Sequence, residues 1–119
     1  MKVINIAEKL DSFSEHWKPK IIAELNGQQI RIAKLKGEFV WHSHENEDEM
    51  FLVIKGMLTI SFRDGDKALN EGEFIIVPKG VEHKPSAEEE VSVLMFEPAT
   101  THNTGNLDND FTIKNLDRI

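Results

Sequence analysis

Hydrophobic and polar residues alternate over short segments through most of the chain, which is the pattern of β-strands with one buried face. Residues 30–35 alternate in this way, and so do residues 58–62. Apolar runs predict three further strands, at 50–54, 74–77 and 91–96. Turn-forming residues separate these strands, at 26–27, 63–66, 70–72 and 78–80. The stretch 20–98 therefore predicts an all-β sandwich or barrel.

The two ends of the chain have a different pattern. Within residues 5–17 the apolar positions are spaced as one face of a helix, at Ile6, Leu10, Phe13 and Trp17. Asn5 followed by Glu8 predicts an N-terminal cap, and Pro19 ends the segment. We expect residues 1–19 to form a helical segment packed on the barrel. The tail 99–119 is polar but contains too many apolar residues for a free tail, so we expect it to pack on the barrel as well.

Two of the predicted strands, 50–54 and 91–96, are apolar on both faces. Only one face of a strand can point into a small barrel, so the other face needs a cover. The N-terminal helix, a second sheet layer or another subunit would provide it, because large exposed apolar patches are rare on monomeric proteins. The pattern favours a homodimer.

Length and charge exclude several classes of function. The chain has 119 residues and a mass of 13.6 kDa, which suits one domain. Its 14 basic and 21 acidic residues give a net charge of −7, which repels nucleic acids and anionic membrane surfaces. The absence of cysteine excludes disulfides, thiolate metal sites and cysteine nucleophiles, and is compatible with a reducing compartment. We expect a soluble, cytoplasmic protein that acts on a small-molecule ligand or substrate, with neither nucleic acid nor membrane as partner.

Three histidines and one glutamate stand out as candidate metal ligands. His42 and His44 are two residues apart, so on a strand both side chains point to the same side and can bind one ion. Glu49 begins the next predicted strand, and His83 follows the turn at 78–80. Three imidazoles and one carboxylate suit a divalent transition metal ion, namely Mn, Fe, Ni, Cu or Zn.

Each candidate also has an ordinary structural interpretation. A His-x-His pair is by itself more often two half-exposed side chains than a metal site. Glu49 can belong to the solvated acidic run that begins at Glu45, and His83 can be a turn residue. His16 in the predicted helix is expected at the surface. His102, in the loop after the last strand, is expected in solvent, with the mouth of a pocket as the alternative.

Two further sets of residues are interpreted as structural. The acidic run Glu88–Glu90 is interpreted as a solvated turn that protects a sheet edge. Six aromatic residues are interpreted as members of the core: Phe39, Trp41, Phe51, Phe62, Phe74 and Phe96.

Taken together, the glycines and candidate ligands resemble the two signatures of the cupin family. The first signature is matched by Gly37, His42, His44, Glu49 and Gly56. The second is matched within residues 72–83 by Gly72, Pro78, Gly80 and His83. Two departures stand out. Four residues rather than the usual five separate the leading glycine from the first histidine, and Ala87 stands where an asparagine is usual.

The resemblance implies a fold and a ligand set. The fold is a double-stranded β-helix, a jelly-roll barrel that holds a metal ion inside, with His42, His44, Glu49 and His83 as its ligands. Four protein ligands leave two positions free on a six-coordinate ion. Counting from Glu49, we expect Phe51 and Val53 to point inward and Trp41 outward. The resulting pocket would be mostly apolar, with few polar anchors.

The resemblance does not select one reaction, because cupins include dioxygenases, isomerases, epimerases, lyases and decarboxylases. We expect a small metal-dependent enzyme, dioxygenase-like or isomerase/lyase-like, acting on a small polar metabolite. The alternative is a metal-containing module that binds or senses a small molecule without turnover. A structural barrel with an incidental ion is the third interpretation. The chain contains no tyrosine, which favours dioxygen chemistry or simple polarisation over a mechanism that needs a dedicated base.

Overall fold

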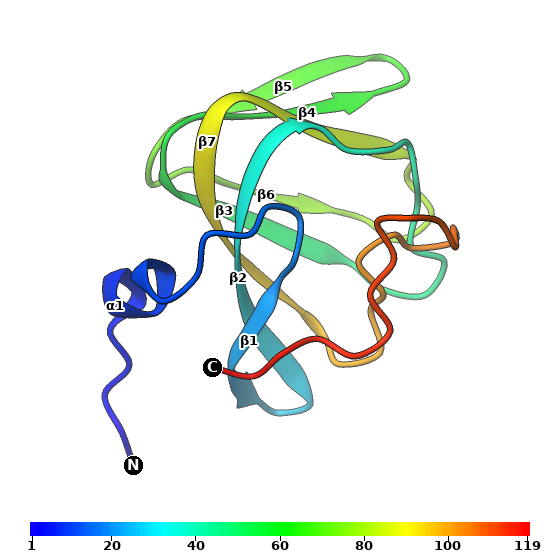
Figure 1. Ribbon diagram of the computed structural model, residues 1–119. Coiled ribbons are helices and arrows are strands. Elements are labelled where there is room, and N and C mark those ends of the chain that lie inside the picture. The colour runs from blue at the N-terminus through cyan, green and yellow to red at the C-terminus, as the bar shows by residue number, and fades with distance from the viewer.

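Seven antiparallel strands in the computed structural model, which describes residues 1–119, form one sheet that curls into a jelly-roll barrel (Figure 1). One short helix, α1 (Ile6–Asp11), precedes the strands, so the structure is all-β with an N-terminal helix, as the sequence predicts. The strands are β1 (Lys20–Leu25), β2 (Gln28–Glu38), β3 (Glu49–Lys55), β4 (Leu58–Phe62), β5 (Gly65–Leu69), β6 (Phe74–Val77) and β7 (His83–Pro98).

Strand β7 connects the two layers of the barrel. Its first part pairs with β4, where His83 lies opposite Phe62. Its second part pairs with β3, where Phe96 lies opposite Met50. Strand β2 runs beside both parts of β7, while β1 and β6 are the outer strands of the β1-β2-β7-β3-β6 layer. Because β7 spans both layers, residues from distant parts of the chain meet inside the barrel.

Inward-facing residues of the two layers form one apolar core. Phe51 and Val53 are 4% and 0% exposed, which confirms that they point inward. Trp41 lies outside the core, with the Arg63 guanidinium 3.8 Å from the centroid of its ring. The core contains Ala33, Leu35, Phe51, Val53, Leu58, Ile60, Leu69, Val77, Ala87, Val91, Val93 and Met95.

The N-terminal helix is shorter than its apolar spacing predicts. The Asn5 cap is confirmed, because its side chain accepts a hydrogen bond from the Glu8 N–H at 3.0 Å. The helix nevertheless ends at Asp11 and does not reach Trp17. Trp17 has a φ of 60°, and its ring stacks on Phe39 with 4.7 Å between centroids. Packing against the barrel therefore overrides the helical periodicity of this segment.

The acidic run Glu88–Glu90 lies within β7, so the prediction of a turn there was wrong. Its three residues are exposed. The register of β2 against β7 shifts at this point, because Leu35 pairs with Val91 whereas Gly37 pairs with Ala87. A bulge thus accommodates three consecutive charges inside a continuous strand, which the charge pattern alone does not reveal.

Phe74 is also not the core residue that was expected, because it is 61% exposed. It lies on the outward face of β6, the outer strand of its layer. Phe39 and Phe51 are buried, and Trp41, Phe62 and Phe96 are half-buried.

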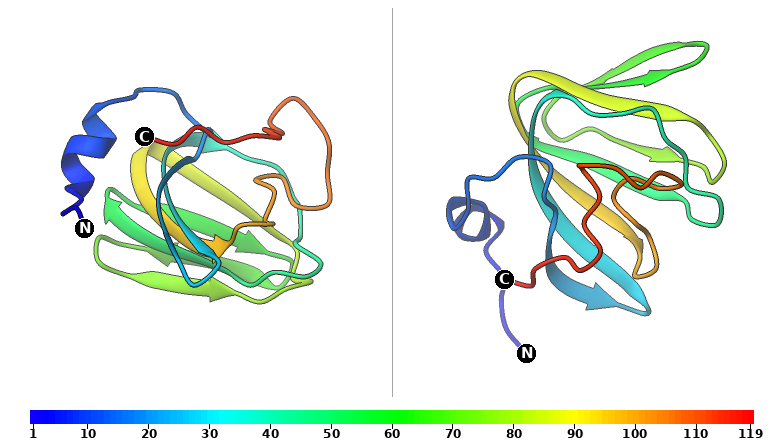
Figure 2. Two further views of the ribbon diagram at one scale, coloured as in Figure 1. Left: turned by 90° about the horizontal axis from the view of Figure 1, so that it is seen from below. Right: turned by 45° about the vertical axis from the view of Figure 1, so that its right-hand side comes forward.

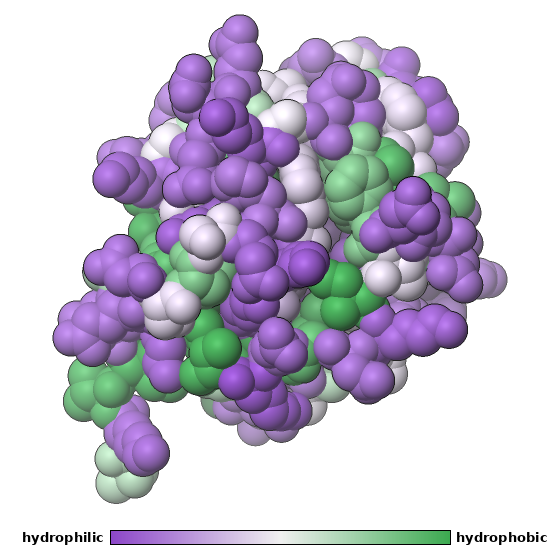
Figure 3. Space-filling view, viewed as in Figure 1, coloured by the Kyte–Doolittle hydropathy of each residue, from purple (hydrophilic) through white to green (hydrophobic).

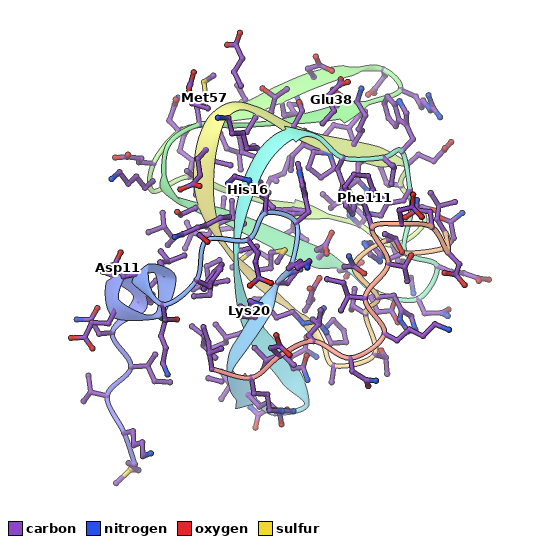
Figure 4. All side chains as sticks on the ribbon, in the orientation of Figure 1. Asp11, His16, Lys20, Glu38, Met57 and Phe111 are labelled. Atoms are coloured by element: carbon purple, nitrogen blue, oxygen red, sulfur yellow. The ribbon has the colours of Figure 1, made fainter.

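Both ends of the chain lie against β1 and β2 (Figure 2). The Lys34 ammonium donates to the carbonyl of Phe13 at 2.6 Å, which fixes the N-terminal segment on β2. The Lys20 ammonium, in β1, donates to Glu15 at 3.0 Å and to Asp117 at 3.2 Å (Figure 4). Lys20 therefore ties the N-terminal segment and the C-terminal tail to the same strand.

The face of the molecule seen in Figure 3 is largely hydrophilic, with apolar residues gathered in small areas. One such area is the chain start, Met1–Ile4, which we call the N-terminal arm and which projects away from the barrel. No helix combines the length and the hydropathy needed to cross a bilayer.

Candidate metal centre

His42 and His83 face each other across a short antiparallel bridge. The His42 N–H donates to the carbonyl of His83 at 3.0 Å, and the His83 N–H donates to the carbonyl of His42 at 2.9 Å. His42 lies in the connection between β2 and β3, and His83 is the first residue of β7. The bridge fixes the two imidazole rings beside each other, with 4.4 Å between centroids.

The C-terminal tail holds the segment 42–44 from the opposite side. The Ser43 N–H donates to Asn106 Oδ1 at 3.0 Å, and the Ser43 carbonyl accepts from the Asn106 N–H at 2.9 Å. Gly105 permits this close approach, because a Cβ there would collide with the carbonyl oxygen of Ser43. The segment is therefore held in place without being part of a regular strand.

Glu49, the first residue of β3, completes a cluster of four buried side chains. Each member is at most 4% exposed, and one potential ligand atom of each lies within 4.8 Å of the others. Glu49 Oε1 is 3.2 Å from His44 Nε2 and 3.4 Å from His83 Nε2. The structure thus brings together His42, His44, Glu49 and His83. That they bind a metal ion stays a prediction.

Backbone carbonyls orient two of the imidazoles. Nδ1 of His42 donates to the carbonyl of Val40 at 2.9 Å, and Nδ1 of His83 donates to the carbonyl of Val81 at 2.9 Å. A carbonyl can only accept, so the proton of each neutral ring lies on Nδ1 and the lone pair on Nε2. Metal-binding histidines are commonly oriented in this way.

Several atoms of the cluster are buried without a hydrogen-bond partner: both ring nitrogens of His44, Oε1 of Glu49 and Nε2 of His83. Buried polar atoms without partners are rare and costly. A divalent transition metal ion fits this set, because imidazole nitrogens and a carboxylate oxygen are its usual ligands. The donor chemistry of the cluster is therefore suited to an ion at its centre.

Burial and the neighbouring His83 lower the pKa of His42 to about 4. The imidazole is therefore neutral near pH 7. Because a histidine must be neutral to bind a metal, His42 need not lose a proton first.

A second carboxyl group, that of Glu97 in β7, interacts with Glu49. Burial disfavours the charge on Glu49, but the polar side chains of Glu97, His44 and His83 that face its carboxylate outweigh burial and hold the pKa of Glu49 well below its usual range. Burial and the Glu49 charge raise the pKa of Glu97 well above its usual range, although Arg31 Nη1 donates to Glu97 Oε1 at 2.7 Å. The contact between the two carboxyl groups therefore displaces their pKa values in opposite directions.

The sequence did not lead us to predict that Glu97 and Arg31 belong to the site, although their positions along the strands indicate that they are buried. Glu97 continues the inward-facing positions of Val93 and Met95, and Arg31 lies directly opposite Met95. An acidic and a basic residue on inward-facing positions of neighbouring strands indicate a buried pair.

A cavity of about 30 Å³ adjoins the cluster. This volume suits about one water molecule. No lysine or arginine lines it, so an anionic ligand would find no counter-charge in its walls. The lining residues are Trp17, Pro19, Leu35, Phe39, His42, Glu49, Phe51, Pro85, Met95, Glu97 and Asn103.

Phe39 links the cavity wall to both ends of the chain. Its ring stacks on Trp17 and contacts His42 edge-on, with 5.3 Å between the centroids of Phe39 and His42. Phe111 of the C-terminal tail packs on Phe39 at 5.0 Å, at the side of the barrel seen in Figure 4. Asn103 of the same tail lines the cavity. The tail therefore forms part of the site and does more than pack on the barrel.

The remaining candidates lie outside the cluster. His16 bonds to Glu90 at the surface, with 2.7 Å between Nε2 and Oε2. His102 is exposed and lines a separate surface cavity of about 450 Å³. In the acidic connection before β3, Glu47 and Asp48 accept hydrogen bonds from neighbouring loops.

Comparison with known proteins identifies the family. The sequence model of the cupin domain matches residues 30–98, which is more than half of the chain. The chain belongs to the cupin domain family. A solved cupin-2 domain protein from Shewanella frigidimarina is 49% identical, with a TM-score of 0.80 over 81% of this cupin and 94% of that chain. Protein NMB1881 from Neisseria meningitidis is 33% identical, with a TM-score of 0.76 over 82% of this cupin and all of that chain.

A curated relative adds to this comparison. The uncharacterized protein YdbB of Bacillus subtilis is 39% identical over 64 residues, or 53% of this cupin. The aligned region spans 57% of that relative.

The two departures from the family signatures leave the cluster intact. The first departure is the shortened spacing between Gly37 and His42. Gly37 has a φ of 80° and lies where the register of β2 against β7 shifts. Ala87, in place of the usual asparagine, is 6% exposed and packs in the core. Neither change removes a candidate ligand.

Proposed function

We propose that this cupin is a metal-dependent enzyme acting on a small metabolite, by dioxygenase-like or isomerase/lyase-like chemistry. The supporting observation is the convergence of four buried nitrogen and oxygen ligands, several without partners, beside a cavity. A bound transition metal ion would supply a Lewis acid or a site for dioxygen chemistry. We also propose a cytoplasmic location, with which the cysteine-free sequence is compatible.

The proposed ligands are His42, His44, Glu49 and His83, and the proposed ion is Mn, Fe, Ni, Cu or Zn. Four protein ligands leave two positions on a six-coordinate ion, as substrate binding requires. The Val40 and Val81 carbonyls orient two imidazoles, so the ligand atoms need little rearrangement. The barrel wall around the cluster excludes bulk water.

The cavity lining supports a substrate class. Trp17, Phe39 and Phe51 give it aromatic walls, and it contains no basic residue. Hydrogen bonding is offered by Glu97 and Asn103. We therefore propose a small uncharged substrate, with hydroxyl or carbonyl groups that reach the ion and an apolar body against the aromatic walls.

The small cavity favours a second candidate, a metal-containing module that binds or senses a small molecule without turnover. At about 30 Å³ the cavity holds one water, so a substrate needs movement of its walls. In the second candidate, binding of the ligand alone would be the function.

The metal site is tested by metal analysis of protein purified without a histidine tag. We expect close to one transition metal ion per chain, and a sharp loss in His42→Ala and in His83→Ala. His102→Ala is the matched control, because this histidine lies outside the cluster, and it should retain the ion. Metal that persists in both cluster variants would contradict the assignment.

The enzyme is tested by oxygen consumption and product analysis with small diols, catechols and β-dicarbonyl compounds. Each assay is repeated with Fe(II), Mn(II), Ni(II) and Zn(II), and turnover should disappear in His83→Ala. Absence of turnover with every metal, together with micromolar binding of a metabolite, would favour the binding module.

A further inference from the structure

The separate surface cavity next to His102, which we call the basic cavity, differs from the cavity beside the candidate metal centre in the charge of its walls. Its volume of about 450 Å³ is in the range of small-molecule sites. Three basic side chains line it, those of Arg31, Lys114 and Arg118, and no aspartate or glutamate does. The cavity beside the metal centre has carboxyl groups in its walls and no lysine or arginine.

The absence of carboxylates from the basic cavity contrasts with the composition of the chain. Acidic residues outnumber basic ones by 21 to 14. Three other surface cavities, of about 470, 550 and 660 Å³, each have an acidic residue in their walls, namely Glu38, Asp11 and Glu8 in that order. Carboxylates would repel an anion from those cavities, whereas the walls of the basic cavity favour one.

Hydrogen bonds hold the walls of the basic cavity in place. One wall is the end of the C-terminal tail, which runs beside β1 (Figures 1 and 2). There the Ile21 N–H donates to the carbonyl of Asp117 at 2.9 Å, and the Ile119 N–H donates to the carbonyl of Ile21 at 3.1 Å. Another wall is the turn after β7, where the carbonyl of Thr101 accepts from Arg31 at 3.0 Å. The folded chain therefore forms this cavity without a ligand.

Lys114 is the cation in these walls that lacks a partner. The lysines that form ion pairs are Lys18, Lys20 and Lys84, and the exposed Lys114 is not among them. The N–H groups of residues 114–116 also donate no hydrogen bond within the chain. Buried N–H groups are almost always paired, so these unpaired ones face water or a ligand. An unpaired ammonium and several unpaired N–H groups thus lie together in one wall.

The two arginines of the cavity contribute in different ways. Arg118 Nη2 donates to Glu24 at 2.6 Å, which leaves the other N–H groups of Arg118 without a protein acceptor. The buried Arg31 is paired with Glu97 and donates to Gln29 and to the carbonyl of Thr101, so its donors are already used. Lys114 and Arg118 are therefore the basic residues that can contact a ligand directly.

We propose that the basic cavity binds a small molecule that carries a phosphate group. A phosphate ester has a charge of roughly −1.5 to −2 near neutral pH and three strong acceptor oxygens, which suits donors supplied by several residues. A carboxylate pairs best with both prongs of an arginine, but Arg118 already binds Glu24. Ile21, Ile113 and Leu116 also line the cavity and would contact the organic part of the ligand.

The proposed ligand is a free metabolite, because the net charge of −7 repels nucleic acids and anionic membranes. The site is also separate from the proposed metal centre, since none of the four candidate metal ligands lines the basic cavity. Failure of either proposal would leave the other untouched.

The test is titration of the isotope-labelled full chain with inorganic phosphate and with glycerol 3-phosphate, followed by amide NMR. We expect both to shift the resonances of residues 113–118, and the ester to bind more tightly because its carbon chain contacts the apolar part of the wall. Glycerol is the uncharged control and should not bind. The shifts should persist after metal has been removed by dialysis, and binding should weaken as salt is added.

A charge reversal tests the role of the unpaired cation. Lys114→Glu should weaken binding of glycerol 3-phosphate at least about tenfold, because it replaces an attractive charge by a repulsive one. Lys67→Glu is the matched control, since Lys67 is also exposed but lies in β5, away from the basic cavity. It changes the net charge by the same amount and should leave the affinity unchanged. The NMR spectrum of each variant shows whether it is folded.

Several outcomes would overturn the proposal. Residues 113–118 that do not shift at about 10 mM of either phosphate would exclude the site. A folded Lys114→Glu variant with wild-type affinity would do the same. Shifts that vanish when metal is removed would place the phosphate at the ion and not in the basic cavity. Succinate that binds as tightly as glycerol 3-phosphate would contradict the choice of phosphate.

Discussion

Two buried polar clusters lie side by side in this barrel, and their hydrogen bonding differs. Around Arg31, the guanidinium donates to Gln29 Oε1 at 3.0 and 2.8 Å, to Glu97 at 2.7 Å and to the carbonyl of Thr101 at 3.0 Å. In the histidine cluster, by contrast, ring nitrogens and a carboxylate oxygen face one another without a hydrogen-bond partner.

This difference separates a structural network from a candidate binding site. The Arg31 guanidinium has protein acceptors for its donors, and of the residues that it binds only Glu97 Oε2 and Thr101 Oγ1 lack a partner. In His44, Glu49 and His83, by contrast, the buried atoms without partners are those that face one another, which is the arrangement that a bound group would satisfy. Burial alone does not distinguish the two clusters, because both are almost fully buried.

The largest expected effect is on stability, when the Arg31 network is broken. Arg31→Ala removes the ion-pair partner of the buried Glu97 and four hydrogen bonds made at 3.0 Å or less. We expect a loss of about 3–5 kcal/mol in the free energy of unfolding. Denaturant titration measures this loss. Arg63→Ala is the control, because Arg63 is exposed, and it should cost about 1 kcal/mol or less. A loss as small as that of the control would show that the network is not structural.

The next effect is a pH dependence of the histidine cluster without added metal. The pKa of His42 is about 4 in the folded chain and 6.5 in the unfolded chain, so the unfolded chain takes up the proton first as the pH falls. Stability due to neutral His42 is fully present above pH 6.5 and is lost as the pH falls towards 4.

Between pH 6.5 and pH 4 the free energy of unfolding should fall by about 3 kcal/mol. The measurement is chemical denaturation at several pH values, compared with His42→Gln. The variant should show a weaker dependence, and equal slopes for the two proteins would contradict the assignment to His42.

A third effect concerns metal addition. An ion that binds only the folded chain should raise the free energy of unfolding by about 2.7 kcal/mol at a concentration of 100 times its Kd. Calorimetric unfolding with and without a chelator measures the change. The stabilisation by metal should disappear in His44→Ala. It should be largely retained in Arg31→Ala, because Arg31 belongs to the other cluster.

The smallest expected effect comes from the tail. Asn106 holds Ser43 between two candidate ligands, so Asn106→Ala should weaken metal binding on the order of tenfold without removing a ligand. Titration calorimetry measures the affinity, and Asn115→Ala, an exposed tail residue, is the control. Equal affinities for the two variants would show that the tail does not position the histidines.

The sequence predicted the barrel from local alternation, and it predicted the four members of the cluster from their resemblance to the two cupin signatures. Alternation along β3 placed Glu49, Phe51 and Val53 on one inward face, and turn residues marked most strand ends. The His-x-His spacing brought two imidazoles together even though the segment is not a regular strand.

Features set by distant parts of the chain could not be predicted in this way. The bulge at Glu88–Glu90 depends on pairing with β2, and Trp17 leaves the helix pattern because Phe39 offers it a stacking surface. The Asn106 contact with Ser43 joins residues 63 positions apart, and no local pattern indicates it.

The central claim is that His42, His44, Glu49 and His83 surround one ion, and anomalous diffraction from crystals of the untagged protein tests it most directly. We predict a single strong anomalous peak inside the barrel, about 2.0–2.2 Å from one nitrogen of each histidine and from a Glu49 oxygen. An empty centre in crystals grown with added transition metal, or a peak only at surface carboxylates, would contradict it.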